Sequence, residues 1–242
     1  MEKTGVYDYR TEIYLLDFRR QLTLPALSNY LLHAAITHAT SRGFGYADME
    51  KRNLLWVLSR LVIEIIDHKR LSEPIRIATW IEGTERILTY RCFEITTMQG
   101  ETLAYARSVW VGINRDTRRP VSLEDMGLMA YKVDRPCPVI LDKFEISTDE
   151  MEPSVPYIIK YSDLDMNGHC NSVKYIEKIL DLFDISIYQN GSIVRFDIVY
   201  QSECFYGSEL SVRKKQINEH EFVASISREG KPVCRAKVLF SV

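Results

Sequence analysis

Residues 24–42 read LPALSNYLLHAAITHATSR and are apolar almost all round. Pro25 suits the first turn of a helix and Gly43 suits a helix end, so the pattern predicts a long helix between them. A helix that lacks a polar face belongs inside a hydrophobic core. We therefore expect the segments that follow this helix to wrap around it.

Strand-like segments follow the helix in the first half of the chain. They are rich in Val, Ile, Tyr, Trp and Thr, and Gln99-Gly100 supplies a turn between the last two of them. These segments span residues 54–66, 75–82, 89–98 and 102–114.

The second half of the chain repeats this order. Residues 171–184 read NSVKYIEKILDLFD and place an apolar face opposite a charged one, which predicts a second helix. Strand-like segments follow at residues 192–201, 209–215, 221–228 and 232–242, with a turn at Glu229-Gly230. A shift of about 130 residues superposes the two glycine turns, which indicates an internal duplication. The predicted fold class is therefore α+β: two units in tandem, each a long helix wrapped by a curved antiparallel sheet, which is a double hotdog.

A proline-rich segment separates the two halves. Five of the eight prolines lie in residues 117–156, and residues 142–152 are acidic, so we expect a linker with a short helix at most. Its end is the expected position of the first strand of the second half. We predict an N-terminal hotdog over residues 1–120, a linker over 121–155 and a C-terminal hotdog over 156–242.

Composition restricts the class of protein. Lys and Arg total 31, Asp and Glu total 33 and the net charge is −2, which lacks the basic excess of a nucleic-acid-binding protein. No apolar run approaches the roughly 18 residues of a membrane span, and the N-terminus reads neither as a signal peptide nor as a transit peptide. Five cysteines without a CxxC spacing disfavour a disulfide framework and a zinc site. We expect a cytoplasmic protein with no metal and no cofactor.

The densest polar cluster lies directly before the second helix, where residues 161–171 read YSDLDMNGHCN. The equivalent residues 16–24 have no His, no Asn and no close acidic pair, so one half carries a candidate site and the other does not. Asp165, Asn167 and His169 alternate, and an extended loop would present all three on one side. The partial positive charge of the helix start would hold a developing oxyanion and keep the imidazole neutral.

A purely structural interpretation competes with this catalytic one, because Asp, Asn and Gly are also favoured in turns and helix caps. We assign Asn171 to the cap of the second helix. Glu203-Cys204 follows a strand, and its carboxylate could serve as a base beside a nucleophilic thiol or activate water beside a bystander thiol. Cys204 is interpreted as a small buried residue, and Cys170 is a weaker thiol candidate.

Two further features have structural interpretations. His33 lies on the apolar helix and is interpreted as a core histidine. The basic run from Arg115 to Arg119 is interpreted as solvated surface, although with Lys132 and Arg135 it could form a patch that faces an acidic partner.

Three segments, in the right order, together resemble acyl-carrier-protein thioesterases of the plant and bacterial fatty-acyl type. Residues 163–175, DLDMNGHCNSVKY, resemble that family's D-L-D-x-N-x-H-x-N-x-x-K-Y segment. Glu203-Cys204 resembles its E-C pair, and residues 108–119, SVWVGINRDTRR, resemble its S-x-W-x-x-x-N-R-x-T-R-R segment. The resemblance covers nearly the whole chain.

The resemblance implies a double hotdog that hydrolyses the thioester of fatty acyl-carrier protein, which releases free fatty acid and ends chain elongation without a cofactor. By position its catalytic residues fall on Asp165, Asn167, His169 and Glu203, with Cys204 included in some schemes. Two mechanisms stay open: attack by a water that Glu203 and His169 activate, or attack by Cys204 with His169 as its base. We prefer water, because transfer of the acyl group to another thiol gains little free energy before water must still act.

The resemblance also sets expectations about partners. The expected partner is the acidic acyl carrier protein, and both a monomer and a homodimer are plausible. Plant members carry a transit peptide, so we expect a bacterial cytoplasmic enzyme. We expect the first half to hold the acyl chain, and each buried methylene is worth ~0.8 kcal/mol, so chain-length preference should be steep. An acyl-CoA thioesterase, a hotdog hydro-lyase acting on 3-hydroxyacyl groups and a non-catalytic acyl-binding protein are the alternatives.

Overall fold

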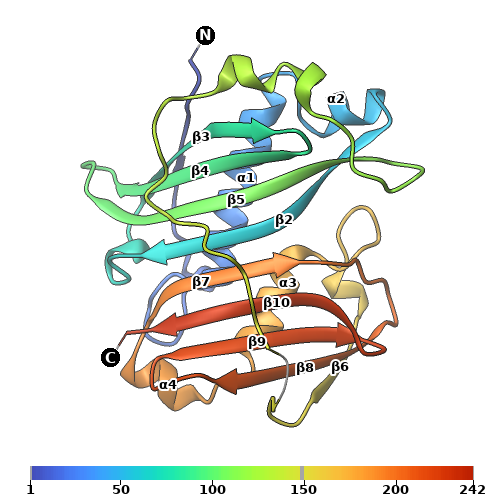
Figure 1. Cartoon of the computed structure of the whole chain (residues 1–242). Helices are drawn as coiled ribbons and strands as arrows, with labels where there is room; N and C mark the ends of the chain where they lie inside the picture. The colour runs from blue at the N-terminus through green and yellow to red at the C-terminus, as the bar shows by residue number, and fades with distance from the viewer. Residues whose placement is uncertain (1, 148–149, 242) are drawn as a thin grey trace. The chain divides into compact units, whose positions relative to one another are not determined.

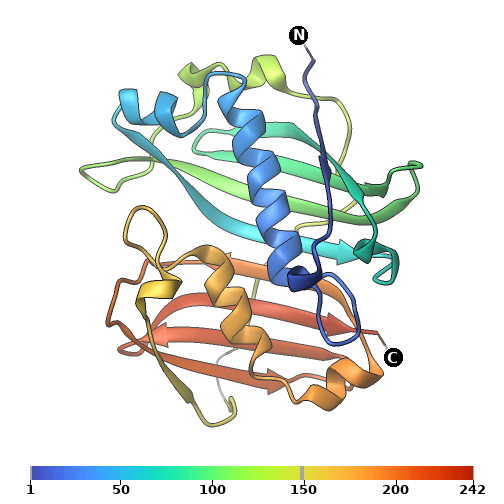
Figure 2. The same cartoon turned by 180° about the vertical axis from the view of Figure 1, so that it is seen from behind.

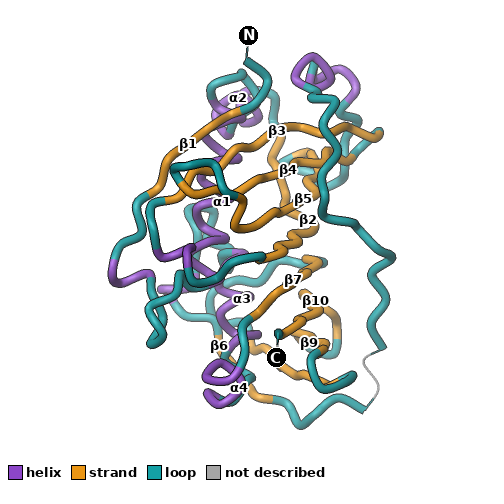
Figure 3. Tube along the Cα trace, turned by 90° about the vertical axis from the view of Figure 1, so that its left-hand side faces the viewer, coloured by secondary structure: helices purple, strands orange, loops and turns teal. Residues whose placement is uncertain are grey.

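The computed structural model describes residues 2–147 and 150–241 and divides into two compact units, Met1–Ile140 and Leu141–Val242. Each unit is an antiparallel sheet with its longest helix against one face (Figures 1, 2 and 3). The predicted α+β plan of two hotdogs in tandem is confirmed. The first unit extends to Ile140, past the boundary that the sequence predicts at residue 120.

The first unit contains five strands in the order β1-β3-β4-β5-β2 among its described residues, and all neighbours are antiparallel. β1 was not predicted; it pairs with β3 from Gly5 opposite Thr79 to Tyr9 opposite Ile75. The elements, in chain order, are β1 (Gly5–Tyr9), η1 (Ile13–Leu15), α1 (Leu24–Thr40), α2 (Tyr46–Lys51), β2 (Leu54–Ile65), η2 (Arg70–Ser72), β3 (Ile75–Glu85), β4 (Leu88–Thr97), β5 (Thr102–Asn114), η3 (Glu124–Met126) and η4 (Leu128–Tyr131).

The long helix α1 begins where the sequence predicts. The Thr23 hydroxyl accepts a hydrogen bond from the Ala26 amide at 3.3 Å, and Pro25 occupies the first turn. The prediction that this helix is buried all round is wrong, because it lies on one face of the sheet (Figure 2) and keeps a side open to solvent. The exposed residues on that side are Asn29, His33, Ile36 and Thr40.

The buried histidine of α1 is His38 and not His33. His33 is exposed and its Nδ1 lies 2.9 Å from the Tyr9 hydroxyl, so its interpretation as a core histidine is wrong. His38, five residues on, faces the core. Its Nδ1 accepts a hydrogen bond from Arg91 at 3.0 Å, which leaves Nε2 to donate to the Lys3 carbonyl. Burial lowers the pKa of His38 to about 3, so it stays neutral.

Part of the predicted linker packs on the first unit. Leu123 and Leu128 are each 1% exposed and lie in one apolar cluster with Phe44 and Ile81. Burial of these side chains joins residues 121–140 to the first unit, because apolar contacts are the main stabilising contribution in a core.

The second unit has five strands in the order β7-β10-β9-β8-β6 among its described residues, again antiparallel throughout. The predicted second helix is shorter than expected, because the Asp184 carboxylate accepts the Ser186 amide at 2.9 Å and starts a separate helix there. The elements are β6 (Val155–Ile158), η5 (Tyr161–Asp163), α3 (Ser172–Leu180), α4 (Ile185–Asn190), β7 (Ile193–Tyr200), β8 (Glu209–Gln216), β9 (Glu221–Arg228) and β10 (Lys231–Phe240).

Within the described residues, no helix combines the length and the apolar character that crossing a membrane takes.

Candidate active site

The polar loop before α3 is a closed turn. It is not the extended segment in which alternate residues would point to one side. The Asp165 amide donates to the His169 carbonyl at 2.7 Å, and the Gly168 amide donates to the Asp165 carbonyl at 3.0 Å. Gly168 has φ +77°, the left-handed conformation that glycine adopts without strain. The expectation that an extended loop presents Asp165, Asn167 and His169 on one side is therefore wrong, because strand alternation does not apply inside a turn.

The Asp165 carboxylate holds this turn closed. Its Oδ1 accepts hydrogen bonds from the amides of Asn167 at 2.8 Å and His169 at 3.0 Å. The Asp165 side chain therefore fixes the backbone on both sides of Gly168. It thereby fixes the position of the His169 backbone that carries the imidazole.

Asp163 fixes the base of the loop. It is 3% exposed, and its Oδ2 accepts from the Tyr157 hydroxyl at 2.7 Å and the Lys160 amide at 2.8 Å. Its carbonyl accepts from the Asn171 amide at 2.8 Å. A buried carboxylate with two donors is a rigid anchor, because breaking either bond would leave it poorly solvated.

The structure brings His169 and Glu203 together across 34 residues of sequence. His169 Nδ1 lies 3.5 Å from Glu203 Oε1, and the two side chains are 21% and 34% exposed. The Cys170 amide donates to the Cys204 carbonyl at 2.8 Å, which ties the two backbone segments. Phe205 packs edge-on against the imidazole at 5.1 Å between ring centres. The imidazole is thus oriented on one side by a carboxylate and on another by an aromatic ring.

The start of α3 is capped as predicted. The Asn171 side-chain oxygen accepts from the Val173 amide at 2.9 Å, and its carbonyl accepts from the Lys174 amide at 2.9 Å. These two amides are already hydrogen-bonded and unavailable to an oxyanion. The helix start therefore offers an oxyanion fewer free backbone amides than the sequence suggests. The Asn167 side-chain amide is exposed, and no residue in 2–147 or 150–241 hydrogen-bonds to it. It is free to donate to a ligand.

Both thiols next to the site are shielded from solvent, Cys204 fully and Cys170 in part. Cys204 is 0% exposed, and burial raises the pKa of its thiol. Burial also raises the pKa of Cys170 to about 12. The Tyr175 hydroxyl lies beside both sulfurs. Both thiols are therefore protonated near neutral pH, which makes them weak nucleophiles.

Arg115 of the basic run, like Lys132 and Arg135 beyond it, pairs with a carboxylate. Arg115 pairs with Glu50 at 2.8 Å, Lys132 with Asp134 at 3.2 Å and Arg135 with Glu94 at 2.8 Å. These ion pairs fit the interpretation as solvated surface and reduce the positive potential that the alternative, a patch facing an acidic partner, would need.

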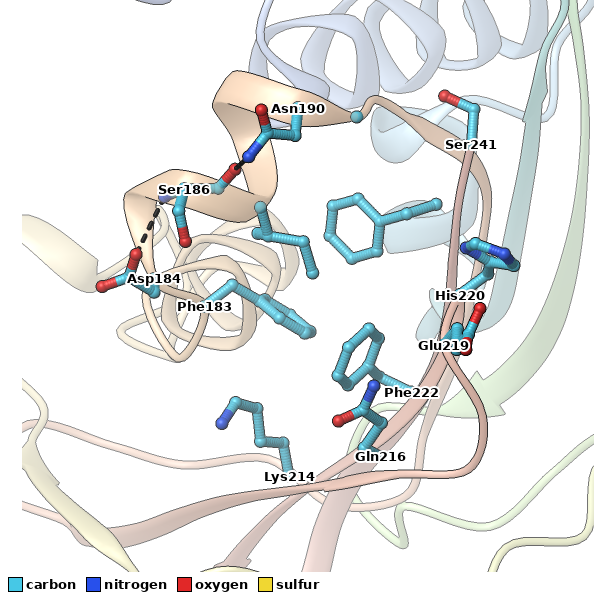
Figure 4. Close-up of a pocket in the computed structure, with 13 residues that line it drawn as sticks. Phe183, Asp184, Ser186, Asn190, Lys214, Gln216, Glu219, His220, Phe222 and Ser241 are labelled. Atoms are coloured by element: carbon cyan, nitrogen blue, oxygen red, sulfur yellow. Dashed lines mark hydrogen bonds between the residues drawn. The ribbon is translucent and has the colours of Figure 1, made fainter.

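A groove of about 480 Å³ in the second unit shares no residue with the His169 loop (Figure 4). Its floor is aromatic: Phe183 packs edge-on against Phe222 at 5.1 Å and Phe240 at 5.3 Å between ring centres. Lys214 on its rim pairs with Glu152. The groove therefore adds nothing to the His169–Glu203 constellation.

Phe205, Asp163 and Tyr175 lie beside the candidate residues but were not chosen from the sequence. Asp163 and Tyr175 lie inside the motif segment, so their proximity to Asp165 and Asn171 was a usable signal. Phe205 carried no signal beyond its position next to Cys204, because its contact with the imidazole depends on tertiary structure. Among the residues described, no group of three or more His, Cys, Asp or Glu side chains is arranged to hold a metal ion.

Replacing Gly168 by Ala should reduce activity through the position of His169. The added Cβ meets nothing within 4 Å, so the cost is backbone strain alone, about 1 kcal/mol of unfolding free energy. We expect a fall in kcat of about ten-fold or more, because small displacements of catalytic groups are costly. Gly230→Ala is the matched control: Gly230 has φ +74° and equally open surroundings, but lies in the β9–β10 turn. Equal activity losses in the two variants would contradict this role of the turn.

The sequence matches the models of one protein family in both of its halves. Residues 3–131 match the family model described as the acyl-ACP thioesterase N-terminal domain, and residues 146–241 match the acyl-ACP thioesterase C-terminal domain. The chain is 40% identical to a solved structure of an acyl-ACP thioesterase from Bacteroides thetaiotaomicron, with a TM-score of 0.91 over 99% of this chain and 98% of that one.

Two plant proteins are also similar. Oleoyl-acyl carrier protein thioesterase 2, chloroplastic, of Arabidopsis thaliana is 30% identical over 209 residues, which cover 79% of this chain and 57% of that protein. Palmitoyl-acyl carrier protein thioesterase, chloroplastic, of the same plant is 27% identical over 205 residues, which cover 79% and 50%. The chain spans about half the length of these curated relatives.

Proposed function

Because the chain belongs to the acyl-ACP thioesterase family, we propose that it hydrolyses the thioester between a fatty acyl chain and acyl carrier protein. The products are the free fatty acid and the carrier thiol, and chain elongation ends. The observation that carries the proposal is the contact between His169 and Glu203 at 3.5 Å on a partly exposed surface. A carboxylate facing an imidazole is the arrangement that general-base catalysis requires.

The proposed nucleophile is water. With Nδ1 directed at Glu203, His169 keeps Nε2 to take a proton from a water molecule as its oxygen attacks the thioester carbonyl carbon. The Glu203 carboxylate stabilises the imidazolium that forms. The tetrahedral intermediate then collapses, the carbon–sulfur bond breaks, and His169 returns the proton to the departing thiolate.

Asn167 and Asp165 have separate roles in this scheme. The exposed Asn167 amide donates to the carbonyl oxygen as negative charge develops on it. Asp165 accepts the amides of Asn167 and His169 and is a positioning residue. Asp165 therefore acts on catalysis through the backbone of the turn.

Cys204→Ala tests whether this thiol is the nucleophile. The Cys204 side chain is 0% exposed and its pKa is raised by burial, so we expect the variant to keep kcat within about five-fold of the wild type. Steady-state hydrolysis of an acyl-carrier-protein substrate is the measurement, with Cys234→Ala as the control for loss of a buried thiol from the same unit. A loss of about a thousand-fold confined to Cys204→Ala would establish the thiol route instead.

The two units have different tasks in this proposal. The second unit carries the chemistry, since its loop contains the polar residues that residues 16–24 of the first unit lack. The first unit holds the acyl chain. The 40% identity to a bacterial protein, against 27–30% to chloroplast proteins, supports a bacterial enzyme.

The proposal is tested by comparing thiol carriers. The purified chain is given one acyl group linked either to acyl carrier protein or to coenzyme A, over a series of chain lengths. We expect a higher kcat/KM for the carrier-protein thioester and a sharp optimum in chain length. Equal or faster turnover of acyl-CoA would assign the chain to coenzyme A substrates. No hydrolysis of either by a folded protein would overturn the thioesterase proposal.

A further inference from the structure

The outer face of the first unit's sheet is covered by residues 132–140. Alternate residues of β4 point to opposite faces: Arg91 faces α1 through His38, so Cys92 faces the other side. There the Trp80 indole donates to the Arg135 carbonyl at 2.9 Å, and Arg107 donates to the Val139 carbonyl at 3.2 Å. Figure 1 shows this covering segment crossing in front of the strands, and Figure 2 shows α1 on the opposite face.

Two cysteines meet beneath this segment. The Glu82 carboxylate contacts both residues. Its Oε1 accepts a hydrogen bond from the Cys137 amide at 3.0 Å, and its Oε2 lies 3.6 Å from Cys92 Sγ. Each sulfur donates to its own oxygen, Cys92 Sγ to Glu82 and Cys137 Sγ to the Ala106 carbonyl at 3.6 Å, and the electrostatic interaction between the two thiols shifts the pKa of both. Arg107 pairs with Glu82 and lies beside both sulfurs. Cys92 is 0% exposed, whereas Cys137 is partly exposed.

The five cysteines of the chain, all within the described residues, differ in acidity. The pKa of the Cys137 thiol is lowered, chiefly by its interaction with Cys92 and further by the Val139 amide and the Arg107 charge, which together outweigh the opposing effects of burial and of the Glu82 charge. The pKa values of the other four are raised, by the Cys137 contact and burial for Cys92 and chiefly by burial for Cys170, Cys204 and Cys234. A partly exposed thiol of lowered pKa beside a second thiol is the arrangement of peroxide-reactive cysteines.

We propose that Cys137 and Cys92 form a reversible redox pair that reacts with peroxides and, when oxidised, fixes the covering segment to the sheet. The Cys137 thiolate attacks one peroxide oxygen, the oxygen–oxygen bond breaks, and Cys137 becomes a sulfenic acid as hydroxide leaves. Cys92 sulfur then attacks the sulfenic sulfur, the disulfide forms, and water leaves. Two thiols lose two electrons and two protons, and one peroxide becomes two waters. A dithiol reductant reverses the reaction.

The test is peroxide oxidation of the reduced, folded chain, followed by thiol counting after denaturation. An equimolar amount of hydrogen peroxide should lower the free thiols from five to three, and a non-reducing digest should contain one linked pair of peptides bearing Cys92 and Cys137. Oxidation should raise the Tm, and dithiothreitol should restore both the Tm and the thiol count.

Cysteine variants distinguish the roles of the two thiols. Cys92→Ala should leave Cys137 as a sulfenic acid that dimedone labels, and Cys137→Ser should abolish both label and disulfide. Cys170→Ser is the matched control, since Cys170 is the other partly exposed cysteine, and this variant should still form the Cys92–Cys137 link. Five persistent thiols, or dimedone labelling spread evenly over the cysteines, would overturn the proposal. The wild-type digest decides the question even if Cys92→Ala fails to fold. The pair lies in the first unit, so its test is independent of the proposed hydrolysis.

Discussion

His169→Ala should lower kcat for acyl-carrier-protein hydrolysis by about a thousand-fold, because it removes the group that takes the proton from water and returns it to the thiolate. The side chain is partly exposed and its turn is held by Asp165 through backbone amides, so the fold should survive the substitution. KM should change little, since the imidazole acts in the transition state. Rapid-quench measurement of released fatty acid is the appropriate assay.

The control for this variant is His220→Ala, which removes a histidine of the same unit from the β8–β9 turn on the rim of the aromatic groove. It should retain wild-type kcat. Activity of His169→Ala above a tenth of the wild type, with matched thermal unfolding, would exclude His169 as the proton carrier.

Glu203→Gln should lower kcat by about a hundred-fold. The amide keeps the size of the side chain but removes the charge that faces His169 Nδ1 at 3.5 Å, so the imidazolium loses its stabilising partner. Glu209→Gln, at the exposed start of β8, is the control for loss of one carboxylate and should leave kcat unchanged.

The double variant shows whether the two residues act together. If Glu203 acts through the imidazole, His169→Ala with Glu203→Gln should be no slower than His169→Ala alone. Losses that multiply would instead mean that Glu203 activates water independently of His169.

The fold was largely predictable because its signals are local and repeated. The glycine turns at Gly100 and Gly230 marked equivalent hairpins, and α1 begins at the predicted cap and proline. β1 was missed because Gly5–Tyr9 is a short segment whose partner, β3, lies about 70 residues away. The break before α4 was also missed: Asp184 was placed within the helix, although its side chain caps the next one.

The sequence supplied the candidate residues of the site but not their geometry. The motif segment singled out His169 and the Glu203-Cys204 pair singled out Glu203, yet spacing alone could not bring together residues 34 positions apart. The turn around Gly168 replaced the assumed extended loop, because Asp165 accepts two backbone amides there. The pairing of Cys92 with Cys137 was not predicted for a related reason. No CxxC spacing links the two residues, and only the path of residues 132–140 across the sheet brings them together.

Water attack at the His169–Glu203 pair is tested most directly by the mass of the intact protein caught during turnover. The enzyme is mixed with an excess of carrier protein that bears a fatty acyl group, and the reaction is quenched in acid within a single turnover. Mass spectrometry then gives the mass of the intact enzyme and detects the released fatty acid. The account predicts free fatty acid alongside protein of unmodified mass at every time point. A protein heavier by one acyl group, with the adduct mapped to Cys204, would contradict it.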